Sequence, residues 1–496
     1  MIQTASAIKI NNKDNVAVAL TDIKQGDVVF DIKATENIPV GHKISLELIS
    51  LNENVVKYGH PIGHATCEIK PGTHVHTHNL KTNLGGIEEY SYSAALQPAT
   101  IGTLPEKTFM GYKRADGQVG IRNEIWIINT VGCVNKIAEK MTAEATAKYK
   151  NENIDGIYTF VHPYGCSQLG DDHTFTQQIL AGMVKHPNAA GVLVLGLGCE
   201  NNLIEDFKKI LGEYDPTRVK FLNTQDVQDE VAVGLLTIKE LVNYASAFKR
   251  EPIPIGKLIL GLKCGGSDGL SGITANALVG SLTDTVTAHG GTCILTEVPE
   301  MFGAETLLME RAINLDVFDK SVRLINDFKG YFIRYGQEIY ENPSPGNKEG
   351  GISTLEEKSL GCTQKGGNSH VVDVLDYGET VKHPGLNLLQ GPGNDIVAVT
   401  NLMAAGAHIV LFTTGRGTPL GAPVPTIKIS SNTALAKSKP HWIDYNAGVL
   451  VSHNFSLSEL TDGLLAYIID VAEGELTQNE INGYREISIF KDGVTL

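Results

Sequence analysis

The stretch IWIINTVGCVN at residues 125–135 decides the fold of the middle of this chain. It joins a run of apolar and β-branched residues, typical of a buried strand, to a Gly-Cys turn. The same pairing recurs in IYTFVHPYGCSQ (157–168) and VLVLGLGCEN (192–201). Neighbouring parallel strands end at one edge of a sheet, about 5 Å apart per strand step. The three thiols are therefore expected to converge there, which predicts a metal or cluster site.

Strand-like runs alternate with helical segments in two parts of the chain. Residues 109–247 contain the three runs above and polar-faced helices such as NKIAEKMTAEATAKY (135–149). Residues 248–496 contain six more runs: KLILGLK, TCILTE, HVVDVL, LNLLQ, HIVLFTT and TIKIS. This alternation predicts a middle α/β domain and a C-terminal α/β domain, with mainly parallel sheets whose functional edge lies at the strands' C-terminal ends.

The N-terminal part has a different pattern. Residues 1–85 carry short alternating runs such as AIKI, NVAVAL and KISLELI, separated by turn residues and without a convincing long helix. Such a pattern predicts a small all-β domain. Residues 86–108 have mixed polarity and no sustained period, and we interpret them as a linker.

Composition excludes several classes of protein. The 496 residues suffice for two to four domains, and the net charge of −15 argues against non-specific nucleic-acid binding. An anionic substrate would need local cations. No run approaches 18 apolar residues and the N-terminus has no signal-peptide core, which predicts a cytoplasmic protein without a membrane partner. Seven cysteines, an odd number, indicate reduced thiols and not a disulfide framework.

Polar residues follow several predicted strands of the C-terminal part. KCGGSDGLSG (263–272) is a Gly-rich turn whose N–H groups can hold a carboxylate or phosphate, and Glu297 and Glu300 follow the next strand. Arg416, in TTGRGT, is suited to bidentate binding of a carboxylate. For each residue alone, helix capping or turn formation is an equally good explanation.

The N-terminal part contains a histidine stripe, HVHTHN at 74–79. His74, His76 and His78 would share one face of a strand and form a metal-binding or substrate-binding edge. The alternative is a solvated surface without chemical function. HExxH, CxxC, Walker A and a strand-linked GxGxxG are all absent from the sequence.

Eight motifs spread along the chain resemble those of a known family. The motifs HVHTHN, YGCSQLGDDH, GLGCENN, CGGSDGLSGITAN, LTEVPEMFGAE, NPSPGNKEGG, SLGCTQK and FTTGRGTP are together similar to those of the altronate/galactarate dehydratases, over essentially the whole chain. The resemblance implies an N-terminal SAF-type β-clip, a middle domain and a C-terminal domain of Rossmann-like topology. It also implies an iron-dependent enzyme favoured by reducing conditions, with Mn²⁺ as a substitute. The galactarate branch lacks the histidine stripe and a cysteine matching Cys362, so these positions would serve altronate alone.

The implied reaction is the dehydration of D-altronate to 2-dehydro-3-deoxy-D-gluconate. It needs a base for the C2 proton and an acid or metal for the departing C3 hydroxyl. Thiolates suit iron, either as a single ion or as an iron–sulfur cluster, a choice that the sequence leaves open. The candidate iron ligands are Cys133, Cys166, Cys199 and Cys264. The candidate catalytic residues are His162 first, then Asp268 and Glu297, with His74 and His76 brought by a lid-like N-terminal domain. The candidate substrate-binding residues are Arg416, Ser267, Asn276 and Asn347.

Three alternatives remain at this stage. The chain could dehydrate galactarate or another sugar acid, which only the substrate that turns over can decide. A nicotinamide oxidoreductase fits the strand pattern but lacks the glycine fingerprint. A non-catalytic sugar-acid binding protein fits the β domain but has no use for four Gly-Cys turns. We expect a homodimer that acts on a small sugar acid.

Overall fold

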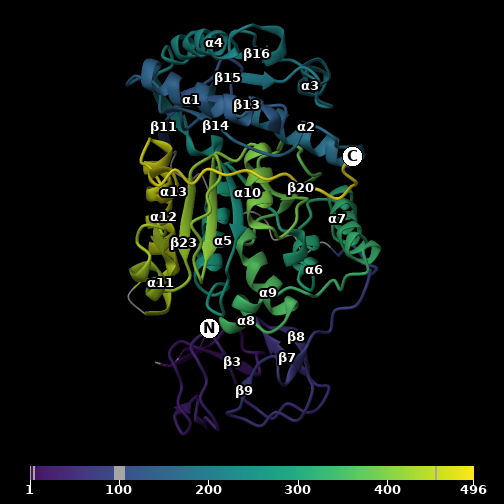
Figure 1. Cartoon of the computed structure of the whole chain (residues 1–496). Coiled ribbons are helices and arrows are strands. Elements are labelled where there is room, and N and C mark those ends of the chain that lie inside the picture. Colours follow the sequence, from purple (N-terminus) through teal and green to yellow (C-terminus); the bar gives the residue numbers. More distant parts are fainter. Residues whose placement is uncertain (1, 4–5, 94–106, 453–454) are drawn as a thin grey trace.

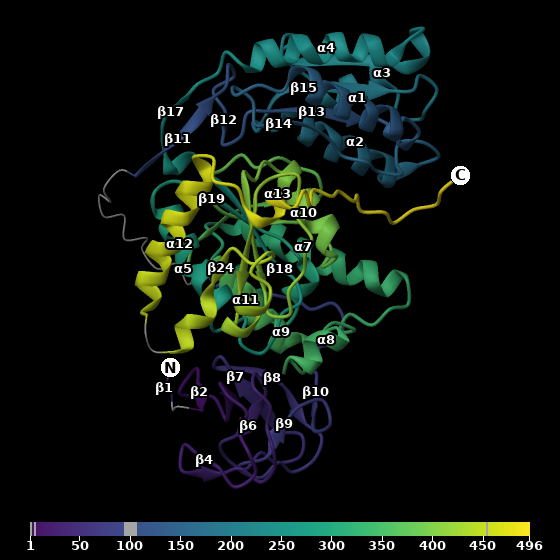
Figure 2. The same cartoon turned by 60° about the vertical axis from the view of Figure 1, so that its left-hand side comes forward.

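The computed structural model describes residues 2–3, 6–93, 107–452 and 455–496. These residues form three parts stacked in a row (Figures 1 and 2): the N-terminal β domain at one end, the middle α/β domain at the other, and the largest, C-terminal domain between them. Most of the predicted linker, residues 94–106, lies outside the described residues. Within the described residues, no helix is both long enough and apolar enough to span a membrane.

The N-terminal domain is all β, as predicted. A five-stranded antiparallel sheet has the order β1-β2-β3-β6-β9, and β10-β8-β7 and β4-β5 form two smaller sheets. The bounds are β1 Ile2–Gln3, β2 Ala7–Lys9, β3 Val16–Ala19, β4 Val28–Val29, β5 Ile32–Lys33, β6 Lys43–Ser45, β7 Asn54–Lys57, β8 His60–Ala65, β9 His74–Val75 and β10 Leu80–Lys81. Alternating apolar residues such as Ile44, Ile62 and Val75 are fully buried and hold the domain together.

The middle domain contains the three predicted strands in one parallel sheet of order β14-β13-β15-β16. The bounds are β13 Glu124–Asn129, β14 Gly156–Thr159, β15 Ala189–Gly196, β16 Val219–Asn223, α1 Asn135–Tyr149, α2 Gly170–Lys185, α3 Ile204–Leu211 and α4 Glu230–Ala245. Ile125 and Ile127 pack towards α1 and α4, whereas Trp126 and Ile128 share a core with α2 and with the C-terminal domain. The two α/β domains therefore have one continuous apolar core between them.

A small antiparallel sheet of order β12-β11-β17 lies at the border of these domains. The bounds are β11 Thr108–Lys113, β12 Val119–Gly120 and β17 Arg250–Pro254. The segment KREPIPIG (249–256) lies just after the border that we predicted between residues 247 and 248. Both of its prolines lie in β17, which pairs with β11.

The C-terminal domain is built on a seven-stranded parallel sheet of order β20-β21-β19-β18-β22-β23-β24, which confirms the predicted Rossmann-like architecture. The strand bounds are β18 Ile259–Cys264, β19 Thr292–Leu295, β20 Val371–Leu375, β21 Gly385–Leu389, β22 Ile409–Thr414, β23 Thr426–Ser430 and β24 Tyr445–Asn446. The helix bounds are α5 Ala275–Ala288, α6 Glu305–Met309, α7 Leu315–Arg334, α8 Pro345–Glu349, α9 Leu355–Cys362, α10 Asp395–Ala404, α11 Thr433–Ser438, α12 Leu457–Ala472 and α13 Gln478–Ile481. The strands in the centre are buried along their whole length, as expected for a sheet covered on both faces.

Candidate functional site at the joint of the N-terminal and C-terminal domains

A cavity lies between the N-terminal domain and the C-terminal edge of the large sheet. Lys57 and Tyr58 line it from the N-terminal domain, and the loop after β18 and helix α9 line it from the C-terminal domain. The C-terminal lining residues are Ser267, Asp268, Gly269, Ser271, Gly272, Asn276, Ile352, Glu357, Lys358, Gly361 and Cys362. In this conformation the cavity has room for about one water molecule.

Glycines allow the two domains to approach this closely. A Cβ at Gly269 would lie 1.9 Å from the carbonyl oxygen of Gly41, and a Cβ at Gly351 would lie 2.3 Å from the same oxygen. Gly351 also has a φ of +101°, which side chains with a Cβ rarely adopt. The Gly-rich turn predicted to cradle a ligand therefore first accommodates the backbone of the N-terminal domain.

A buried ion cluster ties the joint together. Lys43 and Lys57 both place Nζ 2.8 Å from the carboxylate of Glu357, which lies in the first turn of α9. Burial alone would raise the pKa of Glu357, but the two ammonium groups outweigh it and lower the pKa to about 2. Two cations share one carboxylate here, so the cluster has an excess positive charge beside the cavity.

A second polar cluster lies deeper, below the cavity. Glu300 accepts hydrogen bonds from the thiols of Cys264 and Cys362, both at 3.1 Å, and the two sulfurs are 3.2 Å apart. Lys358 lies 2.8 Å from Glu300, and Lys365 donates to the sulfur of Cys264. The hydrogen bond to Cys264 and burial raise the pKa of Cys362 well above its ordinary value, so its thiol is protonated. Burial would raise the pKa of Glu300, but Lys358 and its neighbouring lysines lower it overall.

Glu297 is a structural centre of this deeper cluster. Its carboxylate accepts from Lys263 (2.6 Å) and from the backbone N–H of Cys264 (2.9 Å). Its φ of +71° is a left-handed conformation that is costly for a residue with a Cβ. Such strain persists where the surroundings enforce it, and here both carboxylate oxygens are already occupied. Both oxygens of Glu297 thus take part in the cluster, and its predicted catalytic role stays a prediction.

The predicted substrate residues fall into two groups. Ser267 is buried, and its hydroxyl has no hydrogen-bond partner among the described residues, although it lines the cavity. Asn276 and Asn347 are satisfied by the protein: Asn276 bonds Gly361 and Thr413, and Asn347 caps α8 and bonds Ser267. Of these three residues, Ser267 alone has a buried side-chain oxygen without a partner in the described part of the chain.

Asp268 and Arg416 are also engaged. The carboxylate of Asp268 accepts from the hydroxyls of Ser271 and Ser431 and from the amide of Asn432, so it joins the loop after β18 to the loop after β23. Arg416 is about half exposed and lies 2.8 Å from Glu349. Asp268 is positioned to organise the site, and Arg416 lies at its rim.

His162 does not have the free nitrogen that acid/base work needs. Its Nε2 lies 2.9 Å from the carbonyl oxygen of Asn129 and therefore donates to it, while Nδ1 accepts from the N–H of Tyr164. The ring is buried, and burial lowers its pKa, so it is a neutral structural histidine. Both ring nitrogens thus bond the backbone in this structure, and the predicted acid/base role of His162 stays a prediction.

The three Gly-Cys turns of the middle domain pack against each other at one sheet edge, as their spacing predicts. The N–H of Gly132 bonds the carbonyl of Tyr164, and the N–H of Asn202 bonds that of Gly165. Cys133, Cys166 and Cys199 are all exposed there. Their sulfurs do not form a group of three ligating atoms within 4.8 Å in the described chain, and Cys264 lies in the other domain, beside Cys362. Cys264 thus lies in another domain than the other three predicted ligands, and the role of all four in iron binding stays a prediction.

Three histidines do come together. Ligating atoms of His42, His74 and His76 lie within 4.8 Å of one another, and the rings of His74 and His76 stack at 5.6 Å. Burial and the neighbouring imidazoles lower the pKa of His74 to about 3, and burial with the nearby Lys43 lowers that of His76 to about 4. The rings are thus neutral. His78, the third member of the stripe, is exposed, and its ring lies 5.4 Å from that of His74, but its nitrogens do not belong to the group of ligating atoms.

Several residues of the joint were missed by the sequence analysis: His42, Lys43, Lys57, Glu357, Lys358 and Lys365. One local signal was available, because Lys358, Cys362 and Lys365 have the spacing i, i+4, i+7 that places side chains on one helix face. Thr354 caps the start of α9 and Cys362 ends it. His42 and Lys57 have no such signal, since they reach the site only through the docking of the two domains.

Comparison with known proteins covers the whole chain. Residues 5–83 match the altronate/galactarate dehydratase SAF domain, residues 111–246 the second domain of D-galactarate dehydratase/altronate hydrolase, and residues 255–495 the C-terminal domain of D-galactarate/altronate dehydratase. An altronate dehydratase of Bacillus subtilis (strain 168) is 53% identical over 99% of this chain and 100% of its own length. An altronate dehydratase of Escherichia coli (strain K12) is 52% identical over 99% of both chains. A galactarate dehydratase (L-threo-forming) of Escherichia coli (strain K12) is 32% identical over 95% of this chain and 94% of its own.

Proposed function

The chain belongs to the altronate/galactarate dehydratase family, and we propose that it removes water from D-altronate to give 2-dehydro-3-deoxy-D-gluconate. The observation that carries this proposal is the similarity to two altronate dehydratases at 53% and 52% identity over nearly the whole chain, against 32% for the galactarate dehydratase. The cavity at the joint supports it, because two buried lysines, Lys57 and Lys358, line it beside Asp268 and Glu357 in a chain of net charge −15.

The substrate carboxylate would bind to the cavity lysines after the two domains move apart, because the cavity in this conformation holds about one water molecule. Lys57 and Lys358 both line the cavity and are nearly fully buried, where a charge–charge contact is little screened. The free hydroxyl of Ser267 can donate to, or accept from, a sugar hydroxyl. The same cations would stabilise the negative charge that develops on the carboxylate as the C2 proton leaves.

Iron dependence is part of the proposal. A Lewis acid assists the departure of hydroxide, which is a poor leaving group. The donor chemistry of this chain fits iron at two places: Cys264, Cys362 and Glu300 form a buried group of sulfur and oxygen atoms within 4.8 Å, and the three exposed thiols of the middle domain share one sheet edge. An iron–sulfur cluster contains several iron ions and can bind thiols that are farther apart than the ligands of a single ion. The exposed thiols of the middle domain therefore suit a cluster, and the buried group of Cys264, Cys362 and Glu300 suits a single ion. Mn²⁺ is the proposed substitute.

The thiols also bear on where the protein works. All seven cysteines are free, which fits a reducing compartment, and we propose a cytoplasmic enzyme. The homodimer expected from the sequence remains a prediction.

Turnover of the two candidate acids tests the proposal. Protein purified without oxygen and supplied with Fe²⁺ should convert D-altronate into a 2-oxo acid at least about 100-fold faster, as kcat/KM, than galactarate. The product is identified by NMR. Turnover of galactarate without turnover of altronate would replace the proposal with its alternative, and turnover of neither acid would refute it.

Iron and acid-labile sulfide analysis tests the metal proposal. If the exposed thiols hold a cluster, Cys166→Ser and Cys199→Ser should fold and lose iron and sulfide together, whereas Cys264→Ser should lose iron alone. Full iron content in all three variants contradicts cysteine ligation.

A further inference from the structure

Three imidazoles of the N-terminal domain meet at the joint although they come from separate segments. His42 directly precedes β6, His74 begins β9, and His76 follows it. The antiparallel register of β6 and β9, with Ile44 opposite His74, brings the segments together. His42 is buried, and His74 and His76 are half-buried. This is a built group, unlike a stripe of exposed side chains.

The hydrogen bonds determine which nitrogen of His42 is available. Its Nε2 lies 3.1 Å from the carbonyl oxygen of Glu349, which can only accept, so Nε2 carries the proton. Neutral His42 therefore has its lone pair on Nδ1. Nδ1 of His42 lies 2.9 Å from Nε2 of His74. When His74 carries its proton on Nδ1, its Nε2 also has a free lone pair, and the lone pairs of the two rings face the same small space.

The C-terminal domain supplies outer partners to these rings. Glu349 holds His42, and the hydroxyl of Ser353 lies 2.9 Å from Nδ1 of His76. Ser353 is held in turn by Lys43 at 2.8 Å. A metal-ligating histidine almost always bonds a carbonyl, carboxylate or other polar group through its second nitrogen, which orients the ring. Two of the three histidines show this pattern.

We propose that His42, His74 and His76 bind one divalent first-row transition metal ion. Three neutral nitrogen donors on one side suit Zn²⁺, Fe²⁺, Co²⁺ or Mn²⁺ and leave at least one position for an oxygen ligand. Because no carboxylate belongs to the group, the ion keeps its two positive charges, which favours an anionic ligand such as hydroxide or a carboxylate. This site goes beyond the proposed function, since ion binding here does not depend on which acid turns over and uses none of the cysteines.

Co²⁺ binding to the full chain tests the proposal without any assay of activity. Metal-free protein is titrated with Co²⁺ in the absence of oxygen, and the visible d–d absorption and the thiolate-to-cobalt charge-transfer absorption are recorded. One equivalent should bind with visible absorption that persists in Cys264→Ser and Cys362→Ser. His42→Ala and His76→Ala should each weaken this binding by about 100-fold or more.

His78→Ala is the matched control. His78 belongs to the sequence stripe and its ring contacts that of His74, but it supplies no atom to the group of three, whereas His42 belongs to the group but not to the stripe. Binding that survives His78→Ala and is lost in His42→Ala supports the proposal. Binding that survives His42→Ala, or that disappears in Cys362→Ser, overturns it.

Ser353→Ala keeps the test decisive if a histidine variant fails to fold. It removes the outer partner of His76 and one of the hydrogen bonds of Lys43, and it should weaken Co²⁺ binding by about 10-fold or more, with an unchanged circular dichroism spectrum. Unchanged affinity in Ser353→Ala, measured in a folded protein, contradicts the proposed geometry.

Discussion

The two joints of the C-terminal domain are both built on buried ion pairs, but their charges are balanced differently. At the joint with the middle domain, Arg122 contacts Glu480 at 2.9 Å, and Arg485 contacts Glu124 at 2.8 Å, two cations for two carboxylates. At the joint with the N-terminal domain, Lys43 and Lys57 share the single carboxylate of Glu357.

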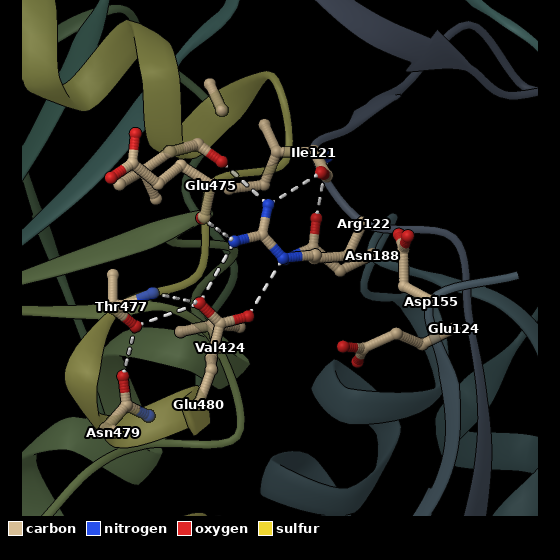
Figure 3. Close-up of polar contacts among 12 residues, drawn as sticks. Ile121, Arg122, Glu124, Asp155, Asn188, Val424, Glu475, Thr477, Asn479 and Glu480 are labelled. Carbon is tan, nitrogen blue, oxygen red and sulfur yellow. Dashed lines mark hydrogen bonds and ion pairs between the residues drawn. The ribbon is translucent and has the colours of Figure 1, made fainter. Parts of the chain in front are cut away.

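The first joint leaves little polar capacity unused. Figure 3 shows Arg122 between Glu480 and the backbone carbonyls of Ile121 and Glu475, while Thr477 supports the same carboxylate from the other side. The second joint has an excess cation, a cavity and the unpaired hydroxyl of Ser267. The difference indicates that one joint holds the molecule together, whereas the other also has capacity for an anionic ligand.

The largest effect is expected at the joint with the middle domain, where cations and carboxylates are equal in number. Arg122→Met leaves the cluster with an excess carboxylate and removes the partner of several backbone carbonyls, so we expect a loss of about 3–5 kcal/mol in the free energy of unfolding. Urea denaturation measures it. KM for altronate should stay unchanged where the protein is folded, and a changed KM with unchanged stability would reverse the roles of the two joints.

The pH dependence of the second joint is expected to be nearly as large. Glu357 has a pKa of about 2 in the folded chain, below its ordinary 4.5, which corresponds to about 3 kcal/mol. This stabilisation is fully present above about pH 4.5 and is lost as the pH falls towards 2. The difference in urea midpoint between the wild type and Glu357→Gln should therefore shrink over that window. A constant difference would show that the Glu357 charge is not what holds the joint.

Lys57→Met separates binding from stability. Lys43 alone balances Glu357, so the variant should change the free energy of unfolding by less than about 1 kcal/mol. It removes a charge from the cavity lining and should lower kcat/KM for altronate by about 100-fold. Steady-state kinetics and denaturation of the same preparation check both. Loss of stability without loss of kcat/KM would mean that the joint with the N-terminal domain only stabilises the protein, like the joint with the middle domain.

The smallest effect is expected at the rim. Arg416 is about half exposed and already pairs with Glu349, so water screens its contribution. Arg416→Lys should raise KM by about 10-fold at most and leave kcat within a factor of about two. A loss of about 100-fold in kcat/KM would indicate that Arg416, and not the buried lysines, binds the substrate carboxylate.

Local patterns predicted the architecture well. The runs IWIINT, IYTFV and VLVLGL became β13, β14 and β15, and the helix predicted at 135–149 is α1 with the same bounds. Such periodicity depends only on residues a few positions apart. A parallel strand that is buried on both faces is a continuous apolar run, which is easy to recognise in a sequence. The strand-end rule also placed the three Gly-Cys turns at one edge.

The chemical roles predicted for single residues stay predictions, although the structure shows which of their atoms are engaged. Both ring nitrogens of His162 bond the backbone, and the carboxylate of Glu297 bonds Lys263 and a backbone N–H. Cys362 shares the Gly-Cys motif with Cys199, yet it is buried at the end of a helix, whereas Cys199 is exposed in a turn. One motif thus has two environments, and the motif alone does not distinguish them.

The sequence by itself determined the three domains, the parallel sheets and the resemblance to a family of dehydratases, because these depend on short-range periodicity and on motifs read in order. Only the tertiary structure decided the composition of the joint. Lys43 and Glu357 are 314 positions apart, and His76 and Ser353 are 277 apart. No local pattern records such pairs, since their contact arises where the N-terminal domain packs against the C-terminal domain.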